Sequence, residues 1–330
     1  MERAESPSGV FSQIDENGHL RHLITLEGLG RKRIEGLIDL AAELRERCKR
    51  GARRLPLLDD RTIISLFYEP STRTRVSFEL AARRLGAQQV NFDLANSSTS
   101  KGENLADTLA TLEAMGCDAF VIRHSENGMP ERLAANAHGA AVINAGDGNH
   151  AHPTQGLLDM LTIRDRKGRI EGLNVLICGD IRHSRVARSD VHALRALGAG
   201  RVRLCGPRVL LPQAGDFEGC EITEDFDAAL DATDVVIMLR LQKERMREVS
   251  ATDTSDYPSH YGLDAVRLAR ARRDALVMHP GPMNRGIEIS ADVADGSQSA
   301  ILEQVANGIF VRMAVLATLL REDEPGAVSA

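Results

Sequence analysis

The sequence predicts an α/β protein with two doubly wound parallel-sheet domains joined by a helical hinge. The chain has 330 residues, more than the roughly 250 to 300 at which a single core stops growing, so two domains are expected. Short apolar runs alternate with helical patterns along most of the chain, which is typical of parallel sheets with helices on both faces. A hydrophobic content of 43% is enough for globular packing.

The composition argues against several classes of protein. A net charge of −6 and an aromatic content of 3% without tryptophan disfavour a nucleic-acid binder. No apolar run is expected to reach the roughly 18 to 20 residues that span a bilayer, and the polar N-terminus does not resemble a secretory signal. The five cysteines are widely spaced and lack the paired spacing of a zinc site. We therefore expect a cytoplasmic protein with reduced cysteines, no metal and no membrane contact.

The first half of the chain gives the first predicted domain. Residues 1–20 are interpreted as a mobile polar arm, or at most a subunit contact. Residues 35–51 have apolar side chains at helical spacing and end at a glycine. Four strand candidates follow: "TIISLFY" (62–68), "QQVNFD" (88–93), "DAFVIRH" (118–124) and "AAVINA" (140–145). A helical pattern at Leu105, Leu109, Leu112 and Met115 lies among them.

The helical segment 151–168 is the predicted hinge between the domains. Four more strand candidates follow it: "NVLICGD" (174–180), "RVRLCG" (201–206), "DVVIMLR" (234–240) and "ALVMHP" (275–280). The last predicted helix, 301–320, has no strand after it, and the residues alone leave open whether it packs on the second domain or crosses back to the first. We set the boundaries at 1–153 plus 305–330 for the first domain and 154–304 for the second.

Polar residues gather where the predicted strands end. In open parallel sheets, ligands bind outside the carboxyl ends of the strands. The residues at those ends are Glu69, Asn91, Arg123, His124, Asn144, Asp180, Arg240 and His279. One such residue is often only a turn residue, so the prediction of a site depends on the whole set.

The stretch "EPSTRTRVSFE" (69–79) indicates an anion site. Helix starts favour acidic residues because their free amides carry partial positive charge, yet this start carries Arg73 and Arg75. With Ser71 as the N-cap, the amides of Thr72 to Thr74, three hydroxyls and a guanidinium would cradle a phosphate. The alternative is an arginine-capped surface helix. No Walker motif, GxxxxGK[ST], occurs.

Three further motifs carry candidate site residues. "NSSTSKGENLADT" (96–108) is a donor-rich loop with Lys101, or merely a linker. "HAHPTQG" (150–156) offers His152 and Gln155 near a helix start, where they can polarise a carbonyl, although a structural histidine is the alternative. "ICGDIRHSR" (177–185) lacks the dinucleotide glycines but offers Arg182 and Arg185, which suit a carboxylate.

Two more motifs lie at the ends of later strands. "MLRLQKER" (238–245) presents Arg240 and Gln242 on one side by alternation. "MHPGPMNRG" (278–286) places prolines on both sides of Gly281, which predicts a rigid turn with a candidate cis X–Pro bond.

With these motifs in this order, the chain resembles the aspartate carbamoyltransferase catalytic chains of the aspartate/ornithine carbamoyltransferase superfamily. The match covers about residues 20 to 322 and includes "FYEPSTRTRVSFE", "SKGENLADT", "VIRH", "NAGDGNHAHPTQGLLD", "GDIRHSR", "RLQKER", "HPGPMNRG" and "NGIF". The resemblance implies that the last helix returns to the first domain. It also implies a homotrimer with active sites at subunit boundaries, alone or in a larger complex with regulatory chains or a dihydroorotase.

The resemblance also implies a reaction and the roles of residues. The family transfers the carbamoyl group of carbamoyl phosphate to L-aspartate in pyrimidine biosynthesis, without a cofactor. The implied carbamoyl-phosphate contacts are Ser71, Thr72, Arg73, Thr74, Arg123, His152, Gln155, Pro280 and Gly281. The implied aspartate contacts are Lys101, Arg185, Arg240 and Gln242. Ser97 and Lys101 would come from the neighbouring subunit, and Glu69 would pair with Arg185 and Arg245 on domain closure. Catalysis would rest on Arg73, Thr74, His152 and Lys101, and Gly281-Pro282 matches the family's cis-proline.

The sequence departs from the family pattern at two places, and three other functions are rival hypotheses. "HPGPMNRGIEI" is the longer of the family's two forms, so Arg285 is given no contact, and Arg182 replaces a lysine. An ornithine carbamoyltransferase would need an anionic partner for its substrate's ammonium and usually carries an HCLP turn, whereas this chain has "HPGP". A dinucleotide-binding dehydrogenase and a non-catalytic scaffold of the same fold are also rival hypotheses. Missing glycines disfavour the dehydrogenase, and intact motifs disfavour the scaffold.

Overall fold

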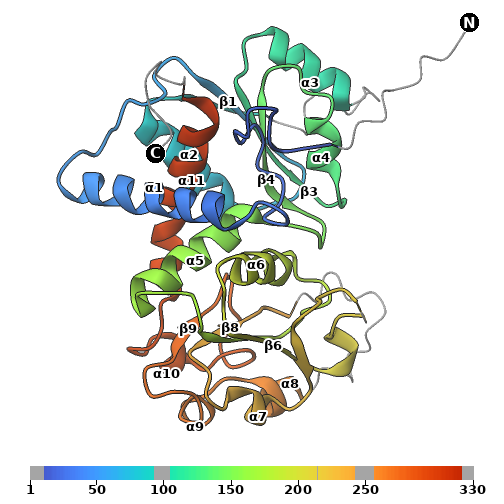
Figure 1. Cartoon of the computed structure of the whole chain (residues 1–330), viewed down its shortest axis with the longest axis vertical. Helices are drawn as coiled ribbons and strands as arrows, with labels where there is room; N and C mark the ends of the chain where they lie inside the picture. Colours follow the sequence, from blue (N-terminus) through green and yellow to red (C-terminus); the bar gives the residue numbers. More distant parts are fainter. Residues whose placement is uncertain (1–10, 93–104, 214, 242–255, 322–330) are drawn as a thin grey trace, which may run out of the picture.

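The computed structural model describes residues 11–92, 105–213, 215–241 and 256–321. They form two α/β domains, with helix α5 (Pro153–Lys167) between them (Figure 1). Every residue of α5 from its start to Ile163 is buried, as expected of a helix covered on all sides. The apolar core is continuous across this helix, from α1 and α2 to one face of the second sheet. The hinge predicted at 151–168 is therefore a packed helix.

The first domain contains a four-stranded parallel sheet in the order β2-β1-β3-β4. Its strands are β1 (Thr62–Phe67), β2 (Gln88–Asn91), β3 (Ala119–His124) and β4 (Ala141–Asp147). Its helices are α1 (Arg31–Lys49), α2 (Thr72–Leu85), α3 (Leu105–Ala114) and α4 (Met129–Ala134). The four predicted strands are all present, and Gly86 ends α2 in the left-handed conformation.

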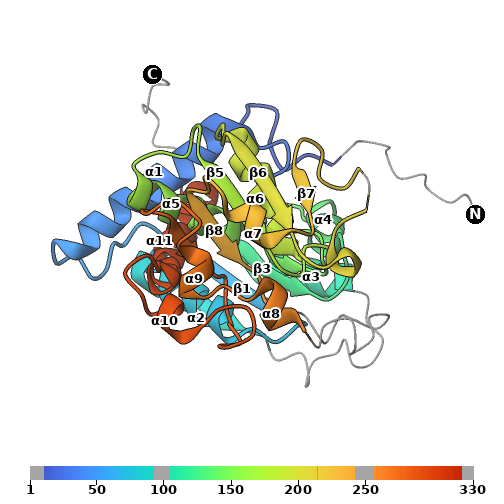
Figure 2. The same ribbon diagram turned by 90° about the horizontal axis from the view of Figure 1, so that it is seen from below.

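The second domain contains a five-stranded parallel sheet in the order β7-β6-β5-β8-β9, seen from below in Figure 2. Its strands are β5 (Asn174–Cys178), β6 (Arg201–Cys205), β7 (Glu221–Thr223), β8 (Val235–Met238) and β9 (Leu276–Met278). Its helices are α6 (Arg185–Ala196), η3 (Arg208–Leu210), α7 (Phe226–Leu230), α8 (Tyr257–Tyr261), α9 (Ala265–Leu268) and α10 (Ala291–Ala294). Strand β7 was not predicted, because it is a three-residue edge strand without a buried residue.

The strand orders place the predicted site residues at the switch points of the two sheets. In the first sheet the strand order reverses between β1 and β3. Glu69 follows β1, and β3 ends at Arg123 and His124. In the second sheet the order reverses between β5 and β8, which precede Asp180 and Arg240. A crevice opens at such points in doubly wound sheets. The fold thus brings both sets of strand ends into position for one shared site.

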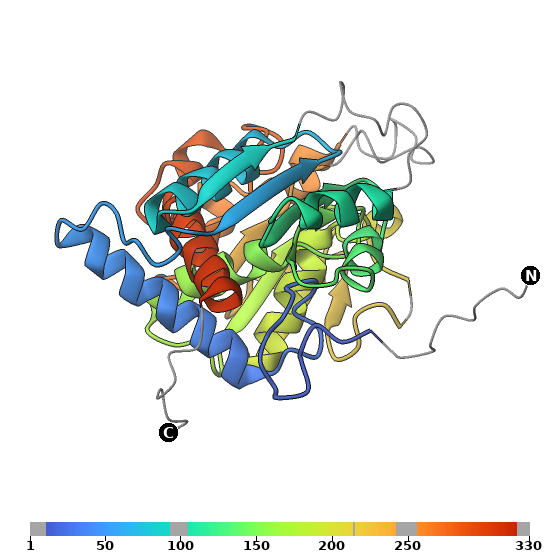
Figure 3. The same cartoon turned by 90° about the horizontal axis from the view of Figure 1, so that it is seen from above.

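Helix α11 (Ile301–Leu320) returns to the first domain, where it packs against α1 and α2 as well as α5 (Figure 3). This agrees with the family resemblance and decides the question that the residues alone left open. By length and composition, α11 could cross a membrane, so the expectation that no segment qualifies is wrong. Its neighbours bury Met313, Leu316 and Leu320 in the core. Its apolar character therefore has a packing explanation.

Residues 11–20, predicted as part of a polar arm, pack on the first domain. The side chain of Gln13 is buried and accepts hydrogen bonds from the backbone N–H groups of Ile24 and Thr25 at 2.9 and 3.3 Å. A short antiparallel bridge joins Ile14 and Leu20, and Leu23 bridges to Ile143 at the edge of β4. Residues 1–10 of the predicted arm lie outside the described residues.

Candidate active site between the two domains

A cavity of about 400 Å³ lies between the domains and is lined by residues from both. Its lining includes Glu69, Ser71, Thr72, Arg73, Thr74, Arg123, His152, Gln155, Arg185, Arg240, Pro280 and Gly281. Every described residue to which the family resemblance assigns a role is in this set. Among the described residues, no cluster of His, Cys, Asp and Glu side chains is placed to hold a metal ion.

A larger cavity, of about 1070 Å³, lies elsewhere in the first domain. Its lining includes Arg61, Asp118 and Ala141, which stand at or just before the amino ends of β1, β3 and β4. It is therefore at the edge of the sheet opposite the strand ends that face the second domain. Because the carboxyl edge is where doubly wound sheets bind ligands, the smaller cavity is the candidate active site.

The start of helix α2 forms one wall of this cavity. Ser71 occupies the N-cap position with extended backbone, as predicted, but its side chain makes no capping hydrogen bond. The first turn of α2 contains no acidic residue. Burial, followed by the charge of Arg240, lowers the pKa of Arg73, which indicates that cations converge here from both domains. Partial and full positive charges therefore point at one place, as an anion site requires.

Glu69 joins the strand ends of the two domains. Arg185, at the start of α6, donates to the Glu69 carboxylate at 2.6 and 3.1 Å. Arg123, at the end of β3, also donates to Glu69, and donates to the carbonyl oxygen of Ala145 at 3.1 Å. One carboxylate thus orients two guanidinium groups that line the cavity. Its pairing with Arg185 is bidentate, which is the geometry that favours strong pairing.

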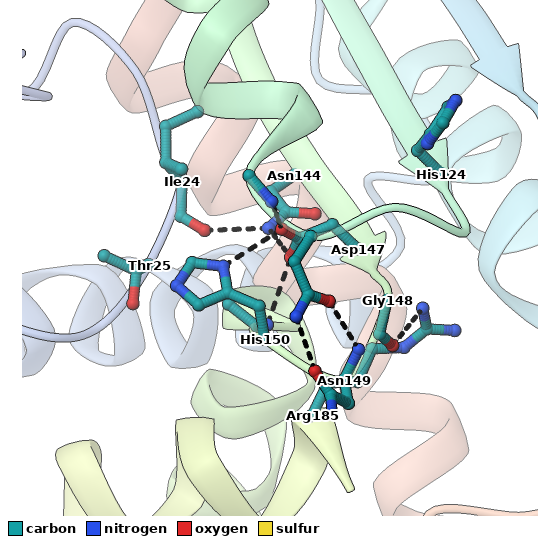
Figure 4. A network of polar contacts seen from close by, with 12 residues as sticks. Ile24, Thr25, His124, Asn144, Asp147, Gly148, Asn149, His150 and Arg185 are labelled. Atoms are coloured by element: carbon teal, nitrogen blue, oxygen red, sulfur yellow. Dashed lines mark hydrogen bonds and ion pairs between the residues drawn. The ribbon is translucent and has the colours of Figure 1, made fainter. Parts of the chain in front are cut away.

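The loop after β4 helps to hold Arg185 in place (Figure 4). The carbonyl oxygen of Gly148 accepts from Arg185 Nη1 at 3.2 Å. The loop is built around the buried carboxylate of Asp147, which accepts from Asn144 Nδ2 at 2.8 Å and from the backbone N–H groups of Gly128 and Ala151 at 2.7 and 3.0 Å. The last of its partners is His150, whose Nδ1 lies 2.9 Å from Asp147 Oδ2. A buried carboxylate with four partners makes a rigid support.

Gly146, directly before the last residue of β4, is a position where a side chain would not fit. Its backbone is in a positive-φ conformation of +118°, and an added Cβ would lie 2.9 Å from Arg123 Nη1 and 3.0 Å from the Arg185 guanidinium. A side chain at this position would therefore displace both arginines.

His152 lines the cavity and is almost fully buried. Burial, followed by the charges of Arg123, Arg185 and Arg312, holds its pKa well below the usual value. Its Nδ1 has no hydrogen-bond partner among the described residues. The imidazole is therefore neutral, so it can polarise a carbonyl without adding a charge that the arginines would repel.

The turn after β9 also lines the cavity. The peptide bond between Gly281 and Pro282 is cis, as the sequence and the family resemblance predict. Gly281 has a φ of +64°, and an added Cβ would lie 3.4 Å from Arg73 Cζ. The turn is held by His279, whose Nδ1 accepts from Gly281 N at 2.8 Å. The backbone at Gly281 therefore lies close to the Arg73 guanidinium, and both line the cavity.

Sequence reasoning missed three buried polar residues around these walls. Arg312 of α11 lines the cavity, and burial lowers its pKa to about 9. Gln304 of α11 also lines it and accepts from His279 N at 2.9 Å. Glu288 is fully buried, and its carboxylate accepts hydrogen bonds from Leu241 N at 3.1 Å and from Asn284 N at 2.7 Å. It therefore links the 279–288 loop to Leu241, which directly follows Arg240. A charged residue within an apolar helix was the available signal for Arg312.

Four predicted site residues, Ser97, Lys101, Gln242 and Arg245, lie outside the described residues. Arg285, to which no contact was assigned, pairs with Asp295 at 2.7 and 2.8 Å and is not part of the cavity lining. Arg182, a candidate from its motif, is not part of the lining either. The described residues with implied roles thus line one cavity, whereas the roles themselves stay predictions.

Two family models cover most of the chain. Residues 21–165 match the carbamoyl-phosphate-binding domain of aspartate/ornithine carbamoyltransferases, and residues 171–319 match their aspartate/ornithine-binding domain. The aspartate carbamoyltransferase catalytic subunit of Xanthomonas axonopodis pv. citri is 57% identical over 310 residues, which is 93% of this chain and 98% of that protein.

Solved structures agree with this match. The Trypanosoma cruzi aspartate transcarbamoylase in complex with carbamoyl phosphate and aspartate superposes with a TM-score of 0.84 at 33% identity, covering 91% of this chain and 97% of that chain. Ornithine carbamoyltransferase from Pyrococcus furiosus superposes with a TM-score of 0.81 at 28% identity, covering 91% and 97%. With the domain architecture, the cavity and these matches in agreement, this chain belongs to the aspartate/ornithine carbamoyltransferase family, and it is an aspartate carbamoyltransferase catalytic chain.

Proposed function

We propose that the cavity between the domains transfers the carbamoyl group of carbamoyl phosphate to the α-amino group of L-aspartate, with the residue roles that follow. The observation that carries this proposal is the convergence of the α2 start, Arg123, Arg185 and Arg240 on one cavity. Two anionic substrates need such a surplus of cations to be held side by side. Once they are aligned, much of the barrier to a two-substrate reaction is removed.

Carbamoyl phosphate binds against the first turn of α2. Its phosphate group accepts hydrogen bonds from the hydroxyl and amide groups of Ser71, Thr72 and Thr74 and from the guanidinium of Arg73, with Arg123 as a further cation. Its carbonyl oxygen faces Arg73, Thr74 and His152. Gln155 and the Pro280–Gly281 backbone accept from its NH2 group. The support for these roles is the position of every named residue in the cavity lining.

Aspartate binds on the side of the second domain. Arg185 and Arg240 pair with its two carboxylates, together with Gln242 and with Lys101 from a neighbouring subunit. The α-amino nitrogen attacks the carbamoyl carbon, negative charge grows on the carbonyl oxygen, and the C–O bond to phosphate breaks. The attacking amine is neutral, and the proton that it loses passes to the departing phosphate, which leaves as hydrogen phosphate. Donors aimed at the oxyanion lower this barrier by an amount on the order of 2.7 to 4 kcal/mol each.

The cavity suits a dicarboxylate better than ornithine. Glu69 is the single acidic residue among the described lining residues, and it already pairs with two arginines. An ornithine ammonium would thus meet guanidinium groups without a carboxylate to balance it. Sequence identity points the same way, with 57% to an aspartate carbamoyltransferase and 28% to the ornithine carbamoyltransferase structure.

The test supplies the purified chain with carbamoyl phosphate and either aspartate or ornithine, and measures the carbamoylated product. We expect N-carbamoyl-L-aspartate and phosphate in equal amounts, and no product from ornithine. Turnover of ornithine, or of neither amino acid, would contradict the proposed reaction.

We also propose a cytoplasmic homotrimer with active sites shared between subunits. Small-angle scattering distinguishes a free trimer from a larger complex. Mixing Arg73→Ala trimers with Lys101→Ala trimers tests the shared site, because hybrid trimers would contain some sites that carry neither substitution. Recovered activity on mixing supports the shared site, whereas continued inactivity with proven subunit exchange contradicts it.

A further inference from the structure

A buried aspartate on α5 holds two amide side chains that line the cavity. Asp159 is fully buried and is not itself part of the lining. Its carboxylate accepts from Gln304 Nε2 of α11 at 2.7 Å and from Gln155 Nε2 at 3.1 and 3.2 Å. Gln155 and Asp159 are four positions apart on α5, the spacing at which such pairs meet on a helix. One carboxylate thus sets the orientation of two amides from different helices.

The hydrogen bonds to Asp159 decide which atom of Gln155 faces the cavity. A side-chain amide has one NH2 group, which donates, and one carbonyl oxygen, which accepts. Because a carboxylate accepts, the NH2 group of Gln155 turns toward Asp159. The carbonyl oxygen of Gln155 accepts no hydrogen bond from any residue that the structure describes. It is therefore an acceptor that an N–H group of a ligand can use.

Gln304 carries the same orientation to the turn after β9. Because its NH2 group also goes to Asp159, its carbonyl oxygen accepts from His279 N at 2.9 Å. His279 directly precedes the Pro280–Gly281 turn, and its Nδ1 accepts from Gly281 N at 2.8 Å. Both acceptors proposed for the carbamoyl NH2 group, the Gln155 amide and the turn, are therefore anchored to Asp159.

An oxygen acceptor at this place distinguishes acyl phosphates by the group that is bonded to the carbonyl carbon. Carbamoyl phosphate carries an NH2 group, which donates. Acetyl phosphate has the same phosphate and carbonyl groups, but its methyl group cannot donate and would leave the Gln155 oxygen unpaired. A site that hydrogen-bonds an N–H group rejects the analogue without it, because the unpaired acceptor loses its hydration. An amide turned the other way would not discriminate in this manner.

We propose that Asp159 is a positioning residue that makes the cavity selective for carbamoyl phosphate over acetyl phosphate, by turning the carbonyl oxygen of Gln155 toward the acyl group. The inference rests on the proposed function, since it assumes that the acyl phosphate binds at the start of α2 with its NH2 group toward Gln155. The phosphate contacts are common to both ligands. The effect of Asp159 should therefore appear in the ratio of the two affinities.

The test measures the dissociation constants of carbamoyl phosphate and acetyl phosphate by calorimetry, without aspartate, so that no turnover is needed. The wild-type protein should bind carbamoyl phosphate at least about tenfold more tightly, as expected when one acceptor is left unpaired. In Asp159→Asn the oxygen can still hold Gln304, but the new NH2 group faces that of Gln155. Gln155 then turns round, and the preference should fall to within about threefold.

Thr162→Val is the matched control. Thr162 lies one turn further along α5 and accepts from Asn307 Nδ2 of α11 at 3.0 Å, and neither residue lines the cavity. The substitution removes a hydrogen bond between the same two helices without touching either amide, so the ratio should stay as in the wild type. An unchanged ratio in Asp159→Asn, or an equal fall in Thr162→Val, overturns the inference.

Two further measurements keep the test decisive if Asp159→Asn does not fold. A wild-type protein that binds both acyl phosphates equally tightly overturns the inference, and so does a Gln155→Leu variant that keeps the preference. Where Asp159→Asn folds, adding it to Gln155→Leu should cause no further change in the ratio. A protein that shows the preference and its loss in these variants, but does not carbamoylate aspartate, would refute the proposed function and leave this role of Asp159 standing.

Discussion

Arg185 Nη2 donates to Glu69 Oε1 at 2.6 Å, and Arg185 Nη1 lies 3.1 Å from Glu69 Oε2. This two-point ion pair joins the loop after β1 in the first domain to the first turn of α6 in the second. Because Glu69 also holds Arg123, one carboxylate relates the proposed carbamoyl-phosphate and aspartate halves of the cavity. The domains are thus connected at the point where the two substrates would meet.

Replacing Glu69 by Gln should weaken substrate binding in both halves. Glutamine keeps the size but removes the charge, and hydrogen bonds to charged groups contribute about 1.5 to 3 kcal/mol. We expect kcat/KM for aspartate to fall by at least about tenfold in steady-state assays. Glu79→Gln is the matched control, because Glu79 makes an exposed pair with Arg83 on the same helix, α2. Equal behaviour of the two variants would argue against this role of Glu69.

Replacing Arg73 by Ala should impair the chemical step more than the binding of aspartate. The residue is proposed to contact both the phosphate and the carbonyl oxygen, so its loss removes a transition-state donor. We expect kcat to fall about 10²- to 10³-fold. Arg75→Ala, two residues further along α2 and outside the cavity lining, should stay within a fewfold of wild type. A small effect at Arg73 would mean that the oxyanion is stabilised elsewhere.

His152 should act as a neutral group over the whole working pH range. Burial and the neighbouring guanidinium groups hold its pKa well below the usual value, so protonation would require a pH far below neutrality. We expect His152→Ala to lower kcat about 10²-fold. His152→Asn, which keeps a neutral donor, should lose less. A kinetic limb near pH 6.5 that disappears in both variants would indicate a titrating histidine instead.

Asp190→Asn should stabilise the protein increasingly as the pH rises. The folded-state pKa of Asp190 is raised, so its contribution to stability is fully present below the unfolded pKa of about 3.9 and is lost as the pH rises toward the folded pKa. The asparagine variant does not have this pH-dependent loss. The difference in free energy of unfolding should therefore grow by up to about 1.4 kcal/mol per pH unit.

The measurement is the melting temperature of both proteins from about pH 5 to 8. A difference in melting temperature that does not change with pH would show that Asp190 is ionised in the folded protein. Asp234→Asn, at a partly exposed position in the same domain, serves as a control for the loss of one acidic side chain.

Much of the site could be predicted because it lies in local sequence. The helix start at Ser71 to Thr74, where a phosphate cradle is proposed, can be read from one short motif, and so can the Gly281-Pro282 turn. The convergence of these segments follows from a general property of parallel sheets, whose carboxyl ends share an edge. Local chemistry and one topological rule were therefore enough to identify the cavity.

The features that were missed depend on contacts between distant segments. Asp159 and Gln304 are 145 positions apart in the sequence, and they hydrogen-bond at 2.7 Å because α5 packs on α11. Arg312 faces the cavity only because α11 crosses back to the first domain. The return of α11 itself was implied by the family resemblance and not by its residues, since an apolar face fits either domain equally well.

The most direct test of the account is a crystal structure of the protein soaked in inorganic orthophosphate. The central claim is that the first turn of α2 is incomplete without a doubly charged anion. We predict phosphate within hydrogen-bond distance of the Thr72–Thr74 amides and the Arg73 guanidinium. A structure with phosphate bound elsewhere and Arg73 turned toward solvent would contradict the account.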